Sequence, residues 1–389
     1  MLRWRAPAQW VRRWKDPSWK CRSGWSKDWL VADPLAPINP ASGTKAGSEG
    51  ASFVLDIGGT WTRASCWPLS AEEPIRMVRT PSRTNHPETP ADQLIDQLVD
   101  LIVSMAPATK GSKVAISLGA ALDHDRGVVY GSAPLWGDSA TDVPISARLN
   151  ARVPNVQWVV KNDVTAMLAA YRAVHSELDA SKIAVVTVSS GIAARYDDPS
   201  SRIMPTDPAG LQGEIGHLPA VTNDLHLECA CGVSDHVAAF ASGPGIRAVA
   251  GAIAMRADPD VLAVSAVVLS PEEFERTFAA ALDADDPFAH SVLREAVNPI
   301  ADVFTYLLTT QPDIERIVMA GGVIESIGVH YRRAVLRRMR HRGVYHTSSS
   351  HPAWLESVIV LARSPQETSP LVGAAILAGA DARRATWIQ

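Results

Sequence analysis

Apolar and polar positions along the chain follow two periods. Short, nearly continuous apolar runs predict buried strands at residues 113–119, 156–160, 183–188, 317–320 and 357–362. Apolar residues at helical spacing predict helices at residues 92–106, 164–171 and 371–380, and residues 246–310 have a helical composition. Strands that alternate with helices in this way predict an α/β fold.

The first apolar run, residues 53–67, is interrupted by a glycine pair and predicts a hairpin. Asp56 precedes Gly58 and Gly59, and Thr60 follows them. Glycine lets backbone N–H groups approach an anion closely, and a carboxylate can hold Mg²⁺ directly or through water. The turn could therefore cradle a phosphate. An ordinary Gly-Gly hairpin would contain the same residues, so the segment alone leaves both interpretations open.

The first fifty residues differ in composition from the rest of the chain. They hold six of the twelve tryptophans, with basic residues between them, and residues 34–50 are rich in Pro, Gly, Ser and Ala. Interleaved Trp and Arg could bind a membrane surface or stack on nucleobases. Because helical periodicity and a continuous apolar run are both missing, we instead expect residues 1–50 to be a disordered, basic, Trp-rich extension and linker.

Composition and charge narrow the classes of function. The chain is 47% hydrophobic and 20% charged, as in ordinary globular proteins. It contains no apolar run of about 18 residues, so we expect no membrane span. Residues 1–30 carry a net charge of +6 and the whole chain carries -4, which leaves -10 for the remainder. An acidic core of this kind argues against nucleic acid as the main partner.

Cysteine usage indicates a reducing cytoplasm. The four cysteines are Cys21, Cys66, Cys229 and Cys231. The last two are too close in sequence to be good disulfide partners and are better suited to binding a metal. We therefore expect a cytoplasmic protein.

Asp163 follows the predicted strand at residues 156–160 and precedes the helix at 164–171. Ligands of open α/β sheets collect at the carboxyl ends of strands, and a carboxylate there could take a proton from a substrate hydroxyl. Asn162 and Asp163 are also good helix N-caps, so these residues alone leave a purely structural role open.

The densest set of metal-ligating residue types lies in the middle of the chain. The segment Gly213-Glu214-Ile215-Gly216-His217 is followed by Cys229-Ala230-Cys231-Gly232, and His236 lies five residues beyond the second cysteine. Two thiolates and two imidazoles would form a closed tetrahedral zinc site, which is typical of a structural role. His226 competes with His217 for a place in that site.

Two further glycine turns complete the pattern, Ser190-Gly191 after one strand and Gly321-Gly322 after another. Taken in order over residues 53–380, these motifs resemble the ROK family of sugar kinases and repressors, and the block from Gly213 to Gly232 is the most specific part. The resemblance implies an actin/hexokinase-type ATPase fold with two lobes around a central cleft, where ATP and sugar meet.

The resemblance also implies the organisation of the chain. Residues 51–163 would form a small N-terminal lobe, and residues 164–370 a large C-terminal lobe with a zinc-binding loop. A helix within residues 371–389 would pack back on the small lobe. A homodimer or homotetramer is expected.

Roles carry over residue by residue. The general base would be Asp163. The ligands of the sugar would be Asn162, Asp163, Glu214 and His217. ATP and its phosphates would be bound by Asp56, Gly58, Gly59, Thr60, Ser190, Gly191, Gly321 and Gly322. Structural Zn²⁺ would be held by His217, Cys229, Cys231 and His236. The cofactors implied are ATP, Mg²⁺ and this zinc ion.

The sequence departs from the family pattern at several positions. His236 stands where the family has a third cysteine, and Ala238 where it has a sugar-binding glutamate. The second phosphate turn is Ser189-Ser190-Gly191-Ile192-Ala193 in place of Gly-Thr-Gly-Ile-Gly, and Gly119-Ala120 replaces a Pro-Gly. Losing a carboxylate that binds a hydroxyl points away from glucose and towards a carbasugar such as a C7-cyclitol.

We therefore predict an ATP-dependent kinase that transfers the γ-phosphate to a hydroxyl of a sugar or cyclitol, and favour a C7-cyclitol kinase over a glucokinase-like enzyme. One alternative is a sugar-binding transcriptional regulator of the same family, which would need an N-terminal helix-turn-helix. The other is a catalytically weak sugar-binding protein, which the altered phosphate turn suggests.

Overall fold

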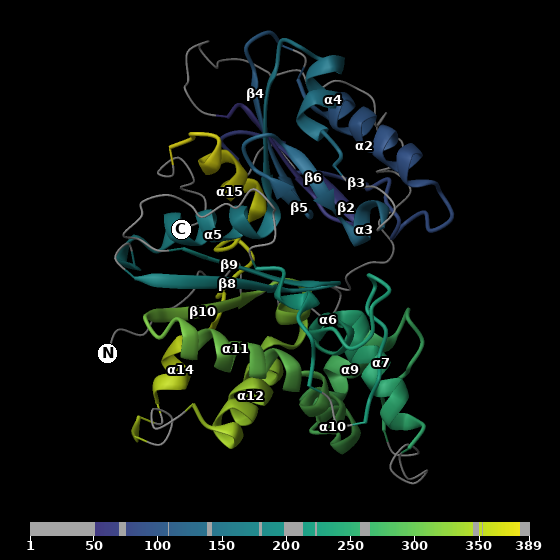
Figure 1. Cartoon of the computed structure of the whole chain (residues 1–389), viewed down its shortest axis with the longest axis vertical. Coiled ribbons are helices and arrows are strands. Elements are labelled where there is room, and N and C mark those ends of the chain that lie inside the picture. Colours follow the sequence, from purple (N-terminus) through teal and green to yellow (C-terminus); the bar gives the residue numbers. More distant parts are fainter. Residues whose placement is uncertain are drawn as a thin grey trace, which may run out of the picture.

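The computed structural model describes residues 51–69, 75–107, 109–137, 142–178, 181–197, 213–221, 224–256, 265–344, 350–351 and 353–381. The predicted extension at residues 1–50 and residues 382–389 lie outside these ranges. The described chain forms two halves, each built around its own sheet (Figure 1). Among the described residues, no helix combines the length and apolar character that crossing a membrane requires.

The first sheet has five strands in the order β3-β2-β1-β4-β7. Their bounds are β1 Phe53–Ile57, β2 Trp61–Cys66, β3 Arg76–Arg79, β4 Lys113–Leu118 and β7 Gln157–Asn162. Strand β1 runs antiparallel to β2 and parallel to β4, which in turn is parallel to β7. The predicted hairpin and the predicted strands at 113–119 and 156–160 are confirmed, although β7 continues to Asn162.

Strand β1 is buried at all five positions because helices cover both faces of the sheet. Leu55 and Ile57 pack with residues of α2 (Ala91–Met105), near α4 (Ile145–Arg152), on one face. Val54 packs with α15 (Pro370–Leu377) on the other. Burial on both faces is the reason why this strand reads as a continuous apolar run.

A small hairpin that the periodicity did not predict follows β4. Its strands are β5 Ala121–Asp123 and β6 Val128–Gly131, and the short helix α3 (Ala133–Trp136) comes next. The turn is fixed by Asp123, whose Oδ1 accepts hydrogen bonds of 2.9 Å from the N–H groups of Asp125 and Arg126. Strands of three and four residues are too short to show a period, which is why the apolar pattern did not predict them.

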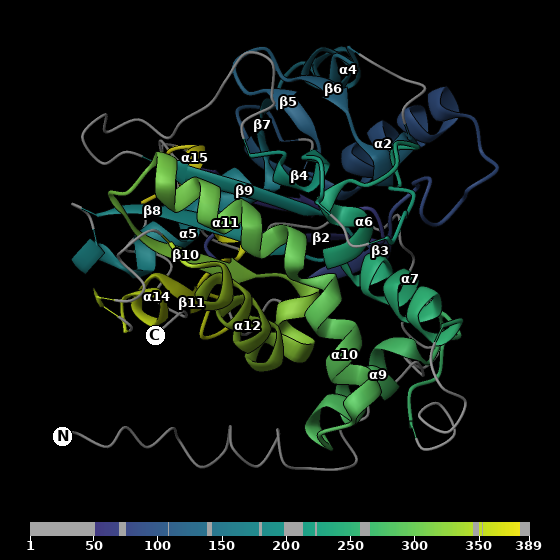
Figure 2. The ribbon, with the colours of Figure 1, turned by 60° about the horizontal axis from the view of Figure 1, so that its bottom comes forward.

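The second sheet has four strands in the order β11-β10-β8-β9. Their bounds are β8 Lys182–Val188, β9 Ile192–Asp197, β10 Ile314–Ala320 and β11 Ile359–Leu361. Strand β9 is antiparallel to β8, and the other pairs are parallel. A group of helices covers one face of this sheet, and Figure 2 brings that face forward, with α11 in front of the strands. They are α6 Val237–Ala241, α7 Gly243–Ala254, α9 Phe274–Asp283, α10 Pro287–Ala296, α11 Asn298–Thr310, α12 Gly322–Arg342 and α14 Trp354–Val358.

Two helices lie between the sheets, α5 (Asp163–Val174) and α15 (Figure 1). They pack closely because α15 has Gly373 at the contact. A Cβ on Gly373 would lie 1.7 Å from the carbonyl oxygen of Ala166 in α5. Helix α5 also contacts β8 and β9, so it connects the two halves of the molecule.

Several predicted boundaries were wrong. Strand β10 begins at Ile314 rather than at residue 317, and α5 continues to Val174 rather than ending at residue 171. Ser357 belongs to α14 rather than to a strand, and β11 begins only at Ile359. The closing helix begins at Pro370, capped by Ser369, and ends at Leu377, three residues earlier than the apolar spacing suggested. The short 3₁₀ turns Ser176–Leu178 (η2) and Ile215–His217 (η4) complete the elements used below.

Candidate active site

Asp163 is the first residue of α5, immediately after β7. Its neighbour Asn162 caps the helix, since Asn162 Oδ1 accepts a hydrogen bond of 3.0 Å from the N–H of Thr165. The other end of the Asn162 amide donates to the carbonyl oxygen of Ala120 at 3.0 Å. The structural role that either residue could have taken therefore falls to Asn162. Its predicted contact with a sugar stays a prediction.

The carboxylate of Asp163 has close neighbours and is affected by nearby negative charges. Oδ1 accepts a hydrogen bond of 2.9 Å from the N–H of Val164, and a Cβ on Gly119 would lie 3.4 Å from Oδ2. Burial, followed by the negative charges of Asp56 and Glu214, raises the pKa of Asp163 to about 7. A carboxylate with such a pKa can accept a proton near neutral pH, as a general base must.

Asp56 lies at the end of β1, opposite Arg63 on β2. It is buried, and both of its oxygens are engaged: Oδ1 accepts from Ser117 Oγ at 2.8 Å and Oδ2 from Arg63 Nη2 at 2.6 Å. Arg63 itself is about half exposed, with 47% of its side chain accessible. Asp56 is thus held in one position next to the predicted phosphate turn.

The turn itself is held by neighbouring segments. The N–H of Gly58 donates to the carbonyl oxygen of Trp61 at 3.0 Å, and Asn85 Nδ2 donates to the carbonyl oxygen of Thr60 at 2.9 Å. A Cβ on Gly59 would lie 2.6 Å from Cβ of Pro134, so only glycine allows α3 to approach this closely. Asn85 was not predicted from the sequence, because nothing in its local pattern marks it as part of the turn.

Strand β9 positions Glu214 and His217 through two glycines. A Cβ on Gly213 would lie 1.6 Å from the carbonyl oxygen of Ala194, and one on Gly216 would lie 2.3 Å from that of Ile192. Gly213 also has a φ of +78°, which favours glycine. The glycines of this motif are therefore explained by close packing on a strand.

Arg195, on β9, is a site residue that the sequence did not reveal. It is buried, and its Nη2 lies 3.9 Å from Oε1 of Glu214. Its Nε donates a hydrogen bond of 3.1 Å to Thr165 Oγ1, and its positive charge lowers the pKa of Asp163. A single arginine among strand residues gives no sequence signal, which is why it was missed.

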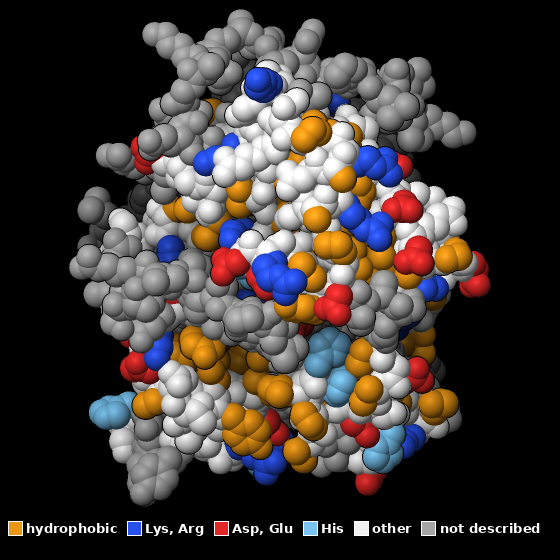
Figure 3. Space-filling view, turned by 45° about the horizontal axis from the view of Figure 1, so that its top comes forward, with side chains coloured by type: hydrophobic (Ala, Val, Ile, Leu, Met, Phe, Trp, Pro, Cys, Tyr) orange, Lys and Arg blue, Asp and Glu red, His pale blue; other side chains and the backbone are white. Residues whose placement is uncertain are grey.

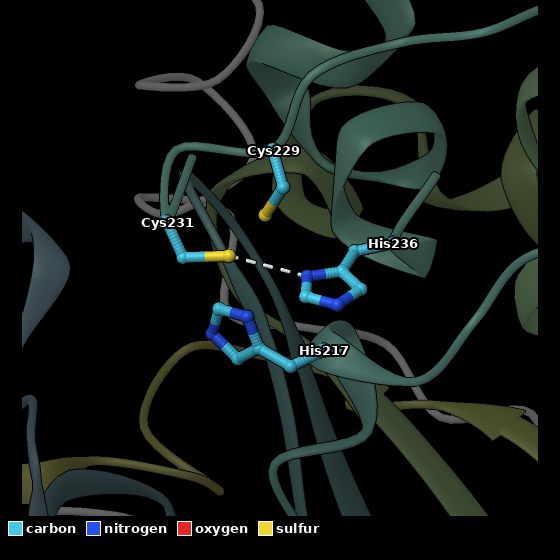
Figure 4. Close-up of side chains that lie close together, drawn as sticks. All are labelled: His217, Cys229, Cys231 and His236. Carbon is cyan, nitrogen blue, oxygen red and sulfur yellow. Dashed lines mark hydrogen bonds between the residues drawn. The ribbon is translucent and has the colours of Figure 1, made fainter. Parts of the chain in front are cut away.

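Four predicted metal ligands lie together. The ligating atoms of His217, Cys229, Cys231 and His236 are all within 4.8 Å of one another. Figure 4 shows the four side chains pointing towards one centre, with Cys231 Sγ 3.2 Å from His236 Nδ1. The two histidine rings stand edge to face, with centroids 5.3 Å apart.

His226 is not part of this cluster. It is 78% exposed, and its Nδ1 lies 2.8 Å from Oδ2 of Asp235. The spacing left His217 and His226 both open as ligands, and the geometry places His217 with the two cysteines and His236. Figure 3 shows histidine side chains near the middle of one face of the molecule, below charged side chains of both signs.

A pocket of about 330 Å³ lies in the second half, at the ends of β8 and β10. Two of the predicted phosphate-binding residues, Ser190 and Gly322, line it, together with Arg247, Phe274 and Phe278. Gly191 and Gly321 directly adjoin these residues. Gly321 has a φ of +98°, and a Cβ there would lie 2.7 Å from the carbonyl oxygen of Val188, so the turn requires glycine.

The residues that carried the sequence resemblance all fall within one matched region. The model of the ROK family matches residues 53–381. The chain belongs to the ROK family. The resemblance seen in the motifs is therefore confirmed, and it extends over both halves of the molecule.

This ROK protein is similar to two cyclitol kinases. It is 40% identical over 333 residues to the 2-epi-5-epi-valiolone 7-kinase of Actinoplanes sp., with 84% of this chain and 92% of the relative covered. It is 30% identical over 291 residues to the C(7)-cyclitol 7-kinase of Streptomyces hygroscopicus subsp. jinggangensis, with 71% and 80% covered.

The fold of this ROK protein matches that of a ROK family glucokinase from Streptomyces griseus, solved in complex with glucose and AMPPNP. The TM-score is 0.63 at 20% identity, and the match covers 84% of this chain and 99% of that chain. The predicted actin/hexokinase-type α/β fold is thereby confirmed.

Proposed function

We propose that this protein is an ATP-dependent kinase that transfers the γ-phosphate of ATP to a hydroxyl of a C7-cyclitol, with Asp163 as the general base. The observation that carries the proposal is the placement of Asp163. Its carboxylate lies at the junction of β7 and α5, where burial and the negative charges of Asp56 and Glu214 raise its pKa to about 7. The similarity to two cyclitol kinases supports the class of acceptor.

The nucleotide would occupy the second half of the molecule and reach towards the first. The pocket lined by Ser190 and Gly322 has the volume and the aromatic lining that suit an adenosine group. The turn from Gly58 to Thr60 would face the phosphates. The buried carboxylate of Asp56 would hold Mg²⁺ through water, since each of its oxygens can accept a further hydrogen bond besides the one from Ser117 or Arg63. The ion would supply positive charge to the phosphates.

The acceptor would lie between Asp163 and Glu214. In the reaction, Asp163 takes the proton of the attacking hydroxyl as its oxygen forms a bond to the γ-phosphorus. The bond between that phosphorus and the bridging oxygen breaks, and ADP leaves. Glu214 and His217 would bind other hydroxyls of the ring and fix its orientation.

Ala238 supports a cyclitol rather than glucose. It lies on α6, which packs against η4, the turn that ends at His217. A glutamate at this position would offer a further acceptor for a hydroxyl, and alanine removes it. The site would therefore favour a ring that lacks or alters that hydroxyl.

The four-residue cluster fits structural Zn²⁺. It offers two sulfur and two nitrogen donors, which is the usual composition of a closed zinc site. Burial raises the pKa of the Cys229 thiol, so a bound cation is what would favour the thiolate form there. The ion would fix His217 and, with it, the loop that carries Glu214.

Purified protein with Mg²⁺-ATP and a panel of acceptors tests the proposal. The panel is 2-epi-5-epi-valiolone, glucose and N-acetylmannosamine, with phosphorylated products detected by mass. We expect the cyclitol to be phosphorylated fastest and Asp163→Asn to abolish turnover. Faster turnover of glucose would reject the cyclitol assignment. Binding of sugars without any turnover would favour the sugar-binding protein, and binding of operator DNA the regulator.

A cytoplasmic homodimer or homotetramer remains our expectation for the assembled kinase. Sedimentation of the full chain at several concentrations would give its oligomeric state.

A further inference from the structure

Arg195 is a buried cation at the boundary between the two halves of the molecule. Only 2% of its side chain is exposed, whereas 25% of its partner Glu214 is exposed. Removing a guanidinium from water is costly unless hydrogen bonds and opposite charges compensate for it, so the groups that Arg195 contacts are fixed relative to it.

One side of the guanidinium is joined to the start of α5. Nε donates a hydrogen bond of 3.1 Å to Thr165 Oγ1, and that hydroxyl lies 3.3 Å from Asn162 Oδ1. Asn162 caps the helix, and Asp163 is its first residue. Arg195 is thus two hydrogen bonds away from the group that orients Asp163.

The other side of the guanidinium faces the loop that carries Glu214. Besides the contact with Glu214, Nη1 donates a hydrogen bond of 2.8 Å to the carbonyl oxygen of Ala194. A Cβ on Gly213 would lie 2.7 Å from the same Nη1, so this loop runs directly against the arginine. Glycine at position 213 is what allows the approach.

We propose that Arg195 is a positioning residue that holds the Glu214 carboxylate and the N-terminal turn of α5 in fixed relation, so that both meet one acceptor. This role rests on the proposed kinase function. Helix α5 follows the first sheet and Glu214 follows the second, so the arginine joins acceptor-contacting groups from the two halves of the molecule.

Arg195 also supplies the positive charge in the acceptor site. The charged groups acting on Asp163 are Asp56 from β1, Glu214 from the loop before η4, and Arg195 from β9. Both carboxylates favour the protonated, inactive form of the base, and the guanidinium opposes them. Removing the guanidinium should therefore move the onset of activity to higher pH.

A second arginine on the same interface offers a matched control. Arg172 lies on α5, seven residues after Thr165, and Asp197 lies on β9, two residues after Arg195. The two form an ion pair, with Arg172 Nε 2.8 Å from Asp197 Oδ2. This pair is also largely buried, with 13% and 11% of the side chains exposed. Substituting Arg172 therefore measures what the loss of a buried arginine between α5 and β9 does to stability and activity in general.

The experiment compares Arg195→Met, Arg195→Lys and Arg172→Met in the full chain, with Mg²⁺-ATP and the cyclitol. For Arg195→Met we expect KM for the cyclitol to rise about tenfold with little change in KM for ATP. We also expect the ratio of kcat at pH 6.5 to kcat at pH 8.5 to fall about threefold or more. Arg195→Lys should keep the wild-type ratio of kcat at the two pH values but not the wild-type KM for the cyclitol. The lysine ammonium keeps the positive charge but cannot reach both Thr165 and Glu214.

Arg172→Met should lower Tm. The ratio of kcat at pH 6.5 to kcat at pH 8.5, and the ratio of KM for the cyclitol to KM for ATP, should stay unchanged. If Arg195→Met behaves like Arg172→Met, the positioning role is rejected while the kinase function stands. If the wild-type chain phosphorylates no cyclitol, the proposed function fails, and calorimetric binding of the cyclitol then decides the role of Arg195. Equal affinity of wild type and Arg195→Met for the cyclitol would overturn the positioning role of Arg195. Weaker binding by Arg195→Met, but not by Arg172→Met, would support that role.

Discussion

The side chain of Asn162 accepts a hydrogen bond of 3.0 Å from the N–H of Thr165, and so it caps the helix that begins at Asp163. Because Asn162 caps the helix, the Asp163 carboxylate is not needed as the cap. It accepts a hydrogen bond from Val164 N–H, and the negative charges of other carboxylates raise its pKa. Asn162 stabilises the helix, and we propose that the next residue, Asp163, carries out the chemistry.

Replacing Asp163 with asparagine should separate activity from stability. Loss of a general base costs about 10² to 10⁴ in kcat. The raised pKa of Asp163 means that the folded state disfavours the charged form, so stability falls as pH rises from about 4 to about 7, and above that the charged carboxylate destabilises the fold fully. We therefore expect Asp163→Asn to lose turnover and to unfold at an equal or higher temperature. A variant that loses activity because it unfolds would contradict this account.

The pH dependence of the wild-type enzyme should follow the same group. The base must be deprotonated to act, and the pKa of Asp163 is raised to about 7. We expect kcat/KM for the cyclitol to rise with pH up to about 7 and then to level off, and Asp163→Asn to remove that rise from any residual activity. A profile that is flat down to pH 5 would show that Asp163 does not titrate as described.

The proposed zinc site should support binding of the acceptor more than binding of the nucleotide. Cys229→Ser should reduce bound Zn²⁺ from about one equivalent per chain, lower Tm, and raise KM for the cyclitol more than KM for ATP, because His217 shares the loop of Glu214. His226→Ala is the control, since His226 is exposed and pairs with Asp235. Metal analysis and calorimetry give the readouts, and loss of zinc from the His226 variant would overturn the ligand set.

Ala238→Glu should shift the choice of acceptor. A carboxylate at this position would offer glucose a hydrogen bond, so we expect the ratio of kcat/KM for glucose to that for the cyclitol to rise about tenfold. Ala238→Gln has a similar size without the charge and should shift the ratio less. Steady-state kinetics with both acceptors would measure the effect, and an unchanged ratio in both variants would show that this position does not select the ring.

Contact between α5 and α15 should depend on Gly373. A Cβ there would lie 1.7 Å from the carbonyl oxygen of Ala166, so Gly373→Ala should lower the free energy of unfolding by about 3 kcal/mol or more. Gly251 in α7 has open space around it, and Gly251→Ala should be neutral or stabilising by about 0.5 to 1 kcal/mol. Chemical denaturation measures both. Equal effects would mean that the helices are not closely packed at Gly373.

Much of the fold followed from the sequence because its strands are buried on both faces. β1, β4 and β8 read as apolar runs, and the order of the glycine motifs identified the family. The end of α14 was misread as a strand because Val358 and the residues of β11 form one apolar run, and periodicity cannot divide so short a segment into helix and strand.

The candidate site was predicted where its chemistry is local in sequence, as at Asp163 and at the cysteine pair. Arg195 and Asn85 were not assigned, because each gains its role from a segment far along the chain. The separation of His217 from His226 likewise depends on the folded loop, in which the exposed His226 lies with Nδ1 2.8 Å from Oδ2 of Asp235.

A competition reaction tests the central claim most directly. Wild-type protein and Asp163→Asn would each receive Mg²⁺-ATP with equal concentrations of 2-epi-5-epi-valiolone and glucose, and the two phosphorylated products would be counted by mass. We predict that wild type makes mainly the phosphorylated cyclitol and that Asp163→Asn makes neither product. A predominance of glucose phosphate, or undiminished turnover by Asp163→Asn, would contradict the account.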